Sequence, residues 1–143
     1  MDRANRVMSG TWGELWLDNE KVADVYKFQA KRTANKETIA LCGQMATDTK
    51  TMSTEGTGSI GFYKTTSFMN IKVGDALEKG QDPRFTLIGK LADPDAYGAE
   101  RVAIYNVSFD DETVADWEAS AIGKIEAPFT WTKREFLDTV VEG

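Results

Sequence analysis

A glycine-rich stretch near the middle of the chain constrains the fold more than any other. Within residues 55–64, the apolar Ile60 and Phe62 alternate with Ser59 and Gly61, which is the two-residue period of a β-strand. Glycine weakens a strand unless the backbone must bend or another segment must come close to it. We therefore predict a strand here that curves or lies against a neighbouring chain.

The same glycines do not predict a phosphate-binding loop. Residues 56–61 have the spacing G-x-G-x-x-G. A dinucleotide-binding loop, however, follows an apolar strand and opens a helix, because the helix N-terminus holds the pyrophosphate. Here no apolar strand precedes the glycines, and an alternating strand follows them. The sequence therefore argues against a nucleotide site.

Charge and composition limit the possible functions. The 143 residues carry a net charge of −6 and contain no histidine. This length predicts a single domain over residues 1–143. The acidic balance disfavours tight binding of DNA or RNA, and the missing histidine removes the commonest general base and metal ligand. Without an export signal or an apolar membrane span, we expect a soluble protein made in the cytoplasm.

No group of residues predicts catalysis, a metal or a cofactor. Cys42 cannot form an intrachain disulfide or a Cys–His pair, so a small core or rim residue is predicted there. The acidic side chains lack the spacing of a calcium loop, and runs of them are typical of solvated loop ends. The carboxylates considered are Asp93, Asp95, Asp110, Asp111, Glu112 and Asp116. The sequence predicts a protein that is not an enzyme.

Alternation and turn residues predict an α+β fold that is mainly antiparallel β, a sandwich or barrel of about seven strands with one flanking helix. An Asp18–Asn19 turn should close the first hairpin. The helix is predicted over residues 67–78, and a short closing helix is considered over residues 132–141. The predicted strands cover residues 11–17, 21–33, 36–42, 55–64, 84–91, 101–109 and 124–132.

Several segments are candidate contacts with other subunits. Trp12 and Trp16 are predicted on one face of the first strand, and Pro128 argues for an edge strand because it cannot donate to a ladder. Residues 1–8 read as a flexible arm and residues 43–55 as a long interaction loop. The candidate interface residues are Trp12, Trp16, Gln44, Thr47, Lys50, Thr54, Gly56, Gly58 and Pro128.

Five phrases in order along the chain carry a resemblance to a known family. They are SGTWGELWLD (9–18), GTG (56–58) leading into FYK (62–64), KGQDPRFTL (79–87), ERV (100–102) leading into YNVSFD (105–110), and PFT (128–130). Together they resemble the tail tube proteins of contractile-tailed phages, in particular the PBSX-prophage type called XkdM-like. The resemblance extends from about residue 9 to residue 131.

This resemblance implies a structural virion protein of the phage tail. Members of the family form hexameric rings that stack into a hollow tube inside a contractile sheath, with strands of neighbouring subunits joined into one inner barrel. The implied partners are further copies of itself, the tail sheath protein, the tape measure protein and a baseplate tube initiator. DNA would pass through the lumen without specific binding, and the long loop and N-terminal arm would link successive rings.

The sequence leaves three other functions open. The same tube could belong to a DNA-free contractile bacteriocin or a defective prophage particle. A non-assembling β-barrel binding module would use Trp12 and Trp16 as its anchor patch and stay monomeric. A hydrolase built on the carboxylates would need a metal or a perturbed carboxylate pair.

Overall fold

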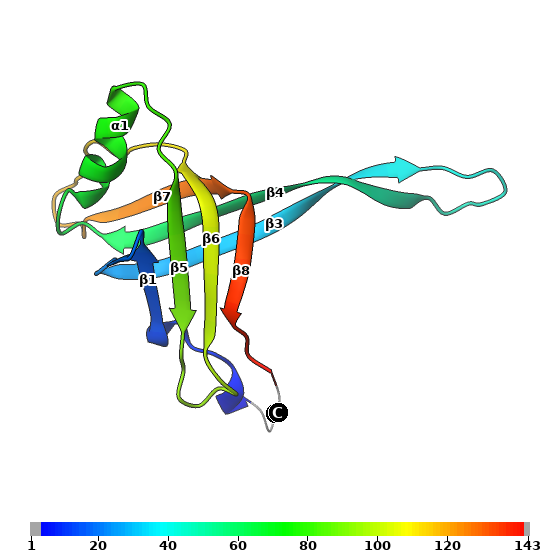
Figure 1. The fold of residues 1–143 in the computed structure, drawn as a ribbon, viewed down its shortest axis with the longest axis horizontal. Coiled ribbons are helices and arrows are strands. Elements are labelled where there is room, and N and C mark those ends of the chain that lie inside the picture. Colours follow the sequence, from blue (N-terminus) through cyan, green and yellow to red (C-terminus); the bar gives the residue numbers. More distant parts are fainter. Residues whose placement is uncertain (1–3, 142–143) are drawn as a thin grey trace.

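The protein is built mainly of antiparallel β-sheet, with one helical segment at its side (Figure 1). The computed structural model describes residues 4–141. The predicted α+β class is confirmed, with eight strands among these residues. The elements are η1 (Ala4–Arg6), η2 (Gly10–Trp12), β1 (Gly13–Leu17), β2 (Glu20–Lys21), β3 (Val25–Ile39), β4 (Asp48–Tyr63), η3 (Asn70–Gly74), α1 (Asp75–Glu78), β5 (Phe85–Leu91), β6 (Glu100–Phe109), β7 (Lys124–Trp131) and β8 (Lys133–Asp138).

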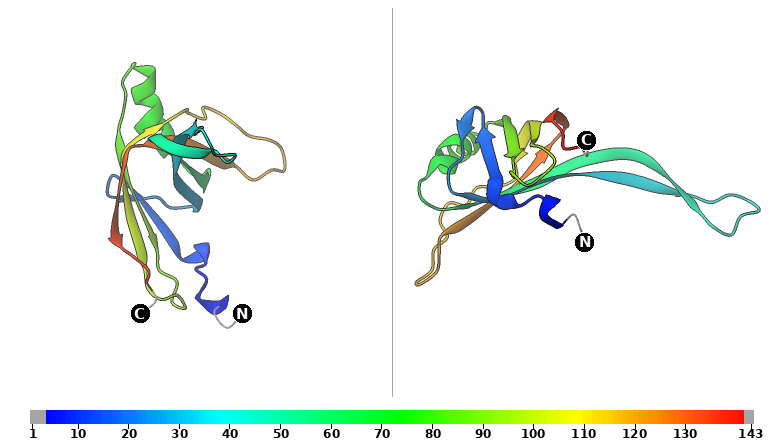
Figure 2. Two further views of the ribbon diagram at one scale, coloured as in Figure 1. Left: turned by 90° about the vertical axis from the view of Figure 1, so that its right-hand side faces the viewer. Right: turned by 90° about the horizontal axis from the view of Figure 1, so that it is seen from below.

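The strands form one sheet that bends at β6. Their order is β2-β1-β5-β6-β7-β4-β3, and β8 pairs with β6 beside β5. The first part of β6 pairs with β5 and β8, whereas only its last residues, Ser108 and Phe109, pair with β7. The two halves of the sheet therefore meet at an angle, as Figure 2 shows from the side. The turn between β1 and β2 has positive φ at Asp18 and Asn19, as a two-residue hairpin requires.

The bend in β6 is centred on Asn106, whose φ is +59°. The β5–β6 register shifts at this point, between the pairs Phe85–Val107 and Leu87–Ile104. An extra residue in the left-handed conformation kinks a strand, and asparagine adopts that conformation more easily than most residues. The Asn106 Nδ2 donates to Thr132 Oγ1 at 3.2 Å, and Thr132 lies between β7 and β8. The two neighbouring strands therefore bend together.

Substitution of Asn106 tests this account of the bend. We expect Asn106→Val to lower the free energy of unfolding by about 1–2 kcal/mol through left-handed strain alone, because a β-branched residue disfavours positive φ. Asn106→Gly loses the same hydrogen bond to Thr132, but glycine adopts positive φ without strain, so this variant is the matched control. Urea unfolding of both variants gives the difference, and equal losses would contradict the role of the backbone conformation.

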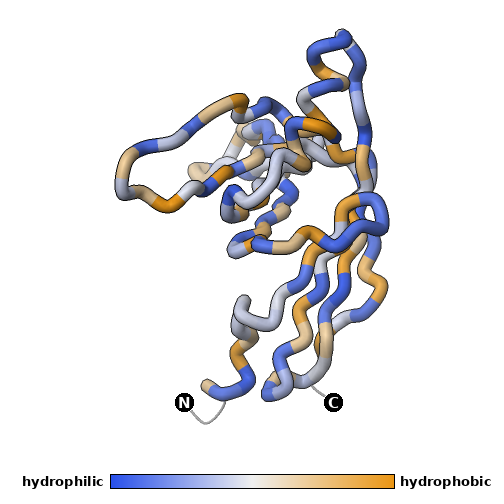
Figure 3. The backbone as a smooth tube through the Cα atoms, turned by 90° about the vertical axis from the view of Figure 1, so that its left-hand side faces the viewer, coloured by the Kyte–Doolittle hydropathy of each residue, from blue (hydrophilic) through white to orange (hydrophobic). Residues whose placement is uncertain are grey.

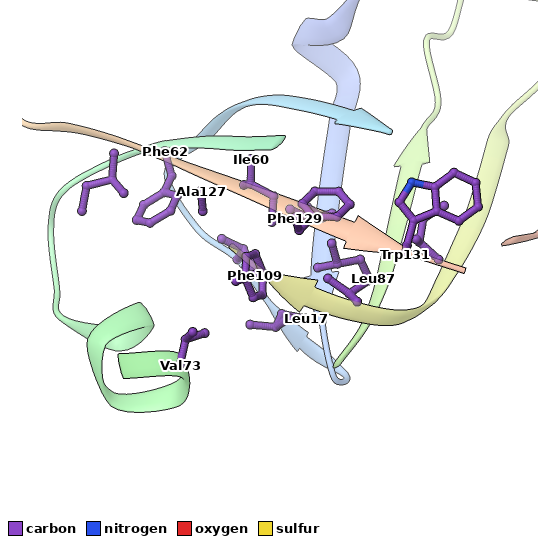
Figure 4. Packing of buried hydrophobic residues seen from close by; sticks show 14 residues of the cluster. Leu17, Ile60, Phe62, Val73, Leu87, Phe109, Ala127, Phe129 and Trp131 are labelled. Carbon is purple, nitrogen blue, oxygen red and sulfur yellow. The ribbon is translucent and has the colours of Figure 1, made fainter. Parts of the chain in front are cut away.

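A hydrophobic core fills the angle between the two halves of the sheet (Figure 4). Phe109 and Phe129 meet edge to face with centroids 5.9 Å apart, and Phe28 stacks on Phe129 at 6.3 Å. The alternate residues of β7 from Ile125 to Trp131 are buried, as the alternation of apolar and polar residues in this segment predicts. The buried hydrophobic cluster comprises Leu15, Leu17, Val22, Ile60, Phe62, Val73, Leu87, Ile104, Val107, Phe109, Ile125, Ala127, Phe129 and Trp131.

The glycines of β4 are explained by close approach of aromatic side chains within the same chain. A Cβ on Gly56 would meet the carbonyl oxygen and indole ring of Trp131, and a Cβ on Gly58 would meet the ring of Phe129. Trp131 Nε1 also donates to the Thr57 carbonyl oxygen at 3.0 Å. The glycines therefore do mark a close approach, but strands β3 and β7 of the same chain provide it rather than a neighbouring chain.

The predicted helix is present from residue 68 to residue 78, but its centre is a π-helix over Asn70–Gly74. The Glu112 carboxylate packs against the glycine inside it, in the space that a Cβ on Gly74 would occupy. Asn70 Nδ2 donates to that carboxylate at 2.6 Å. Among residues 4–141, no helix has the length and apolarity needed to cross a bilayer.

Three sequence expectations are corrected. The closing helix over residues 132–141 is wrong, because residues 133–138 form the exposed strand β8 and hydrogen-bond with β6 instead. The strands predicted over residues 21–33 and 36–42 are replaced by β2 and one long strand, β3. The loop over residues 43–55 is shorter than predicted, because β4 begins at Asp48. The polar residues at the start of β4 face solvent on both sides of the strand. The sequence there therefore shows no alternation of apolar and polar residues.

The N-terminal segment lies against the β5–β6 loop from Arg6 onward. Arg6 Nη1 donates to the Asp95 carbonyl oxygen at 3.0 Å, and the Ser9 N–H donates to the buried carboxylate of Asp93 at 2.9 Å. The expected free arm over residues 1–8 is therefore attached over its second half. Residues 1–3 lie outside the described residues.

Candidate assembly interface

Strands β3 and β4 extend far beyond the body of the protein as a two-stranded ribbon (Figure 1). We call residues 34–54 the hairpin arm. Its strands remain paired out to Ile39 and Asp48, and residues 40–47 form the tip. A bulge between Asn35 and Lys36 interrupts the register. Every residue of the arm except Asn35 is exposed, so this ribbon contributes nothing to the hydrophobic core.

The hairpin arm carries large apolar side chains that nothing in the chain covers. Leu41 is 52% exposed, Met52 is 60% exposed and Met45 at the tip is fully exposed. An isolated two-stranded ribbon is only marginally stable in water, and exposed apolar side chains gathered on one element mark interaction sites. The arm therefore has the properties of a segment that packs against another molecule.

Four of the predicted interface residues lie on the hairpin arm. Gln44 and Thr47 are in the tip, while Lys50 and Thr54 lie on β4. All four are exposed. Cys42 is also exposed in the tip, so its predicted place in the core or at the rim of the fold is wrong. The structure thus brings these residues onto one projecting element, and their contact with another subunit stays a prediction.

Gly56, Gly58 and Pro128 lie in the body of the protein rather than on the arm. The two glycines already have intramolecular neighbours in Trp131 and Phe129. Pro128 pairs with Ser59 of β4, and its carbonyl oxygen accepts from the Asp110 N–H at 2.9 Å. The edge prediction for Pro128 is therefore corrected: β7 is an interior strand, and its proline lies where the ladder with β6 ends.

The two N-terminal tryptophans do not share one strand. Trp12 ends the short helix η2 and is 51% exposed, whereas Trp16 is half-buried in β1, opposite Lys21 and Ile88. The prediction that both lie on one face of the first strand is wrong, since that strand begins at Gly13. Trp12 remains available at the surface.

Strands β3 and β8 each leave one edge unpaired among the described residues. The outer edge of β3 and the outer edge of β8 have no strand beside them. Unpaired edges offer backbone hydrogen bonds to another chain. On its paired side, β8 is held to β6, where Tyr105 Oη donates to Glu135 Oε2 at 2.9 Å. This hydrogen bond, with desolvation and the charge of Glu135, raises the pKa of Tyr105.

Two further surface features were not found from the sequence. Residues 113–122, which we call the Trp117 loop, project from the body and carry Trp117 at 88% exposure (Figure 3). A groove of about 950 Å³ also runs between β3 and strands β1, β5 and β6. We call it the basic groove. The one sequence signal of this projecting loop is that residues 110–123 show neither the two-residue period of a strand nor the 3.6-residue period of a helix.

The described residues contain no arrangement suited to catalysis on a metal. Among residues 4–141, no three acidic or cysteine side chains are grouped as metal ligands. Asp93, the buried acidic residue, accepts from the backbone N–H groups of Ser9 and Asp95. Its carboxylate therefore organises the β5–β6 loop and the N-terminal segment.

Comparison with known proteins identifies the family. The family model "Phage tail tube protein" matches residues 2–138. Phage-like element PBSX protein XkdM of Bacillus subtilis (strain 168) is 38% identical over 132 residues, covering 90% of this chain and 89% of XkdM. A solved Bacillus subtilis protein is 35% identical, covering 96% of this chain and all of its own, with a TM-score of 0.55.

More distant structures share the fold. A chain of the PVC sheath–tube complex, an extracellular contractile injection system in its extended state, has a TM-score of 0.68 at 8% identity. That match covers 94% of this chain and 92% of the other. The predicted resemblance is confirmed, as is the prediction of a structural rather than an enzymatic protein. The chain therefore belongs to the phage tail tube protein family and has the fold found in contractile injection systems.

Proposed function

We propose that this protein forms hexameric rings that stack into the inner tail tube of a contractile particle. The observation that carries this proposal is the hairpin arm, an exposed ribbon with apolar side chains that the body of the protein leaves uncovered. The unpaired edges of β3 and β8 add to it, because neighbouring subunits could join their strands there into one continuous inner barrel.

The architecture of similar structures supports six-fold rings. The chains that share this fold come from an anti-feeding prophage baseplate described as 6-fold symmetrised and from a gene transfer agent tail refined with C6 symmetry. A further one comes from a sheath–tube complex. By analogy, the partners of this protein are copies of itself and the tail sheath protein, with the tape measure protein inside the tube and a baseplate initiator at its end. It would be made in the host cytoplasm and function in the virion tail.

The charge of the chain suits a tube that conducts DNA. Six copies at −6 each would give a ring a net charge of −36. DNA carries one negative charge per ~1.7 Å, so an acidic or neutral lumen would let it pass without binding. We propose that acidic residues face the lumen. Substituting lumen carboxylates with lysine should slow DNA ejection from assembled particles, and unchanged ejection would contradict an acidic lumen.

Electron microscopy of the purified, concentrated protein tests the proposed assembly. We expect hollow rings or open-ended tubes of uniform width, with a matching fast-sedimenting species. If the wild-type protein stays monomeric, the measurement is repeated with a baseplate or sheath partner, since tubes can await an initiator. A chain that remains monomeric with these partners would favour a non-assembling binding module, with the exposed Trp12 as its surface anchor.

A second candidate is the tube of a particle that carries no DNA. The likeness to an extracellular contractile injection system is the observation that favours it. Nuclease protection distinguishes the two: particles purified from the host and treated with nuclease should retain encapsidated DNA only if the tube serves a DNA-delivering phage.

A further inference from the structure

The Trp117 loop is a projection that is anchored at both ends and carries an uncovered aromatic side chain. At its start, Glu112 accepts from Asn70 at 2.6 Å, and at its end the Gly123 carbonyl oxygen accepts from the Lys64 N–H at 2.8 Å. Between these anchors Trp117 is 88% exposed and Val114 is 77% exposed. The loop extends well away from the body in the left view of Figure 2. A tryptophan held in this way is typical of an interface hot spot.

The segment that carries Trp117 is strongly acidic. Residues 110–123 contain five carboxylates and no lysine or arginine, which gives this segment a net charge of −5. Among the described residues, no cation lies within 4 Å of the carboxylates of Asp110, Asp111, Asp116 or Glu118, so these charges have no ion-pair partner within the chain. A partner of this loop must therefore combine an apolar site with positive charge.

The basic groove has that combination. Its lining includes five cationic and two acidic side chains, a net charge of +3 in a chain whose total is −6. Among residues 4–141, Lys31, Lys90 and Arg134 have no carboxylate within 4 Å. The groove also contains apolar surface, with Phe136 at 42% exposure and the half-buried Phe28 and Val102. Its volume of about 950 Å³ is ample for a tryptophan side chain and its neighbours.

The Trp117 loop does not occupy the groove of its own molecule, since Trp117 is 88% exposed and the loop projects away from the body (Figure 2). The loop ends at Lys124, which lies beside Tyr26 at one end of the groove. Trp131 lines the groove seven residues further along β7, about 23 Å away. The hairpin tip is a poorer occupant of the groove, because residues 40–47 contain no charged side chain. Two different, complementary surfaces on one chain are the requirement for a head-to-tail contact that can close into a ring.

We propose that the Trp117 loop of one copy inserts into the basic groove of the next copy. Trp117 covers the apolar floor of the groove, and Asp116 and Glu118 face its cationic rim, which includes Lys90 and Arg134. This inference rests on the proposed tube function and specifies one contact between its subunits. The contact joins two different surfaces, so every subunit in the ring must present its loop in the same direction around the ring.

Single substitutions test the contact through the concentration at which the protein assembles, measured by sedimentation and electron microscopy. We expect Trp117→Ala to raise that concentration by at least about 30-fold, the loss typical of a hot-spot tryptophan. The monomer should keep its circular dichroism spectrum and Tm, because an 88% exposed side chain contributes little to the fold. Glu78→Lys, an exposed helix position outside both surfaces, is the control for a change of charge and should assemble normally.

A charge exchange gives the sharper test. Asp116→Arg and Arg134→Asp should each weaken assembly, and the double variant should restore it. Normal assembly of Trp117→Ala together with no rescue in the double variant would overturn the contact while leaving the tube function intact. Rings of Trp117→Ala that fail only to bind sheath would also overturn it, because the loop would then face the sheath. Failure of the wild-type protein to assemble even with its partners would instead overturn the proposed function and, with it, this contact.

Discussion

Removal of the distal hairpin arm is expected to give a folded protein that no longer assembles. In this variant an Asn-Gly turn joins Ala34 directly to Thr54, which already lie opposite each other in the β3–β4 ladder. None of the buried core residues lies in the deleted segment, so the Tm should change by only a few degrees. Assembly should be lost because the exposed apolar side chains of the arm no longer reach a neighbouring subunit. Sedimentation and electron microscopy measure this loss.

A milder variant separates the length of the arm from its apolar contacts. Serine at Ile39, Leu41 and Met45 keeps the arm but removes three of its exposed hydrophobic side chains, and it should weaken assembly without shortening the ribbon. Hydrogen exchange gives an independent readout, since the amides of the arm should exchange rapidly in the monomer and slowly in the tube. Tubes formed as readily by the truncated chain, or equal exchange in the two states, would contradict a role of the arm in assembly.

Substitution of Gly58 is expected to have the largest effect on the stability of the monomer. In Gly58→Ala, the new Cβ would meet the Gln29 carbonyl oxygen on one strand and the Phe129 ring on another. A backbone oxygen in a paired strand cannot move away at small cost, so we expect a loss of about 1–3 kcal/mol in the free energy of unfolding. For a chain of this size that loss lowers the Tm by roughly 3–10 °C.

The control for Gly58 is another glycine with free space around it. A Cβ on Gly98 would have no neighbour within 4 Å, so Gly98→Ala should leave the Tm almost unchanged. Thermal unfolding followed by circular dichroism compares the two variants. Equal Tm values would show that β4 can shift away from Phe129, and that the glycine is not required by close packing.

The candidate interface was only partly predictable from the sequence. Gln44 and Thr47 lie in the segment without period that the sequence indicated as an interaction loop, and their contact with another subunit stays a prediction. From Asp48 onward, however, this segment is part of strand β4. Cross-strand hydrogen bonds can form there without an alternation of apolar residues, because both faces of the strand are in solvent. Trp117 was not singled out because exposure depends on where the loop is anchored, and Asn70 and Lys64 provide those anchors from distant parts of the sequence.

The sequence by itself determined the strand-rich class, the buried face of β7 and the family. These follow from local alternation, as in Ile125 to Trp131, and from short phrases whose residues are neighbours along the chain. Tertiary structure alone decided where the sheet bends and which residues meet across it. Asn106 kinks β6 beside Thr132, and residues 133–138 become a strand because β6 offers them an edge. Such pairings join residues far apart in sequence, and their hydrogen bonds leave no periodic signal in either segment.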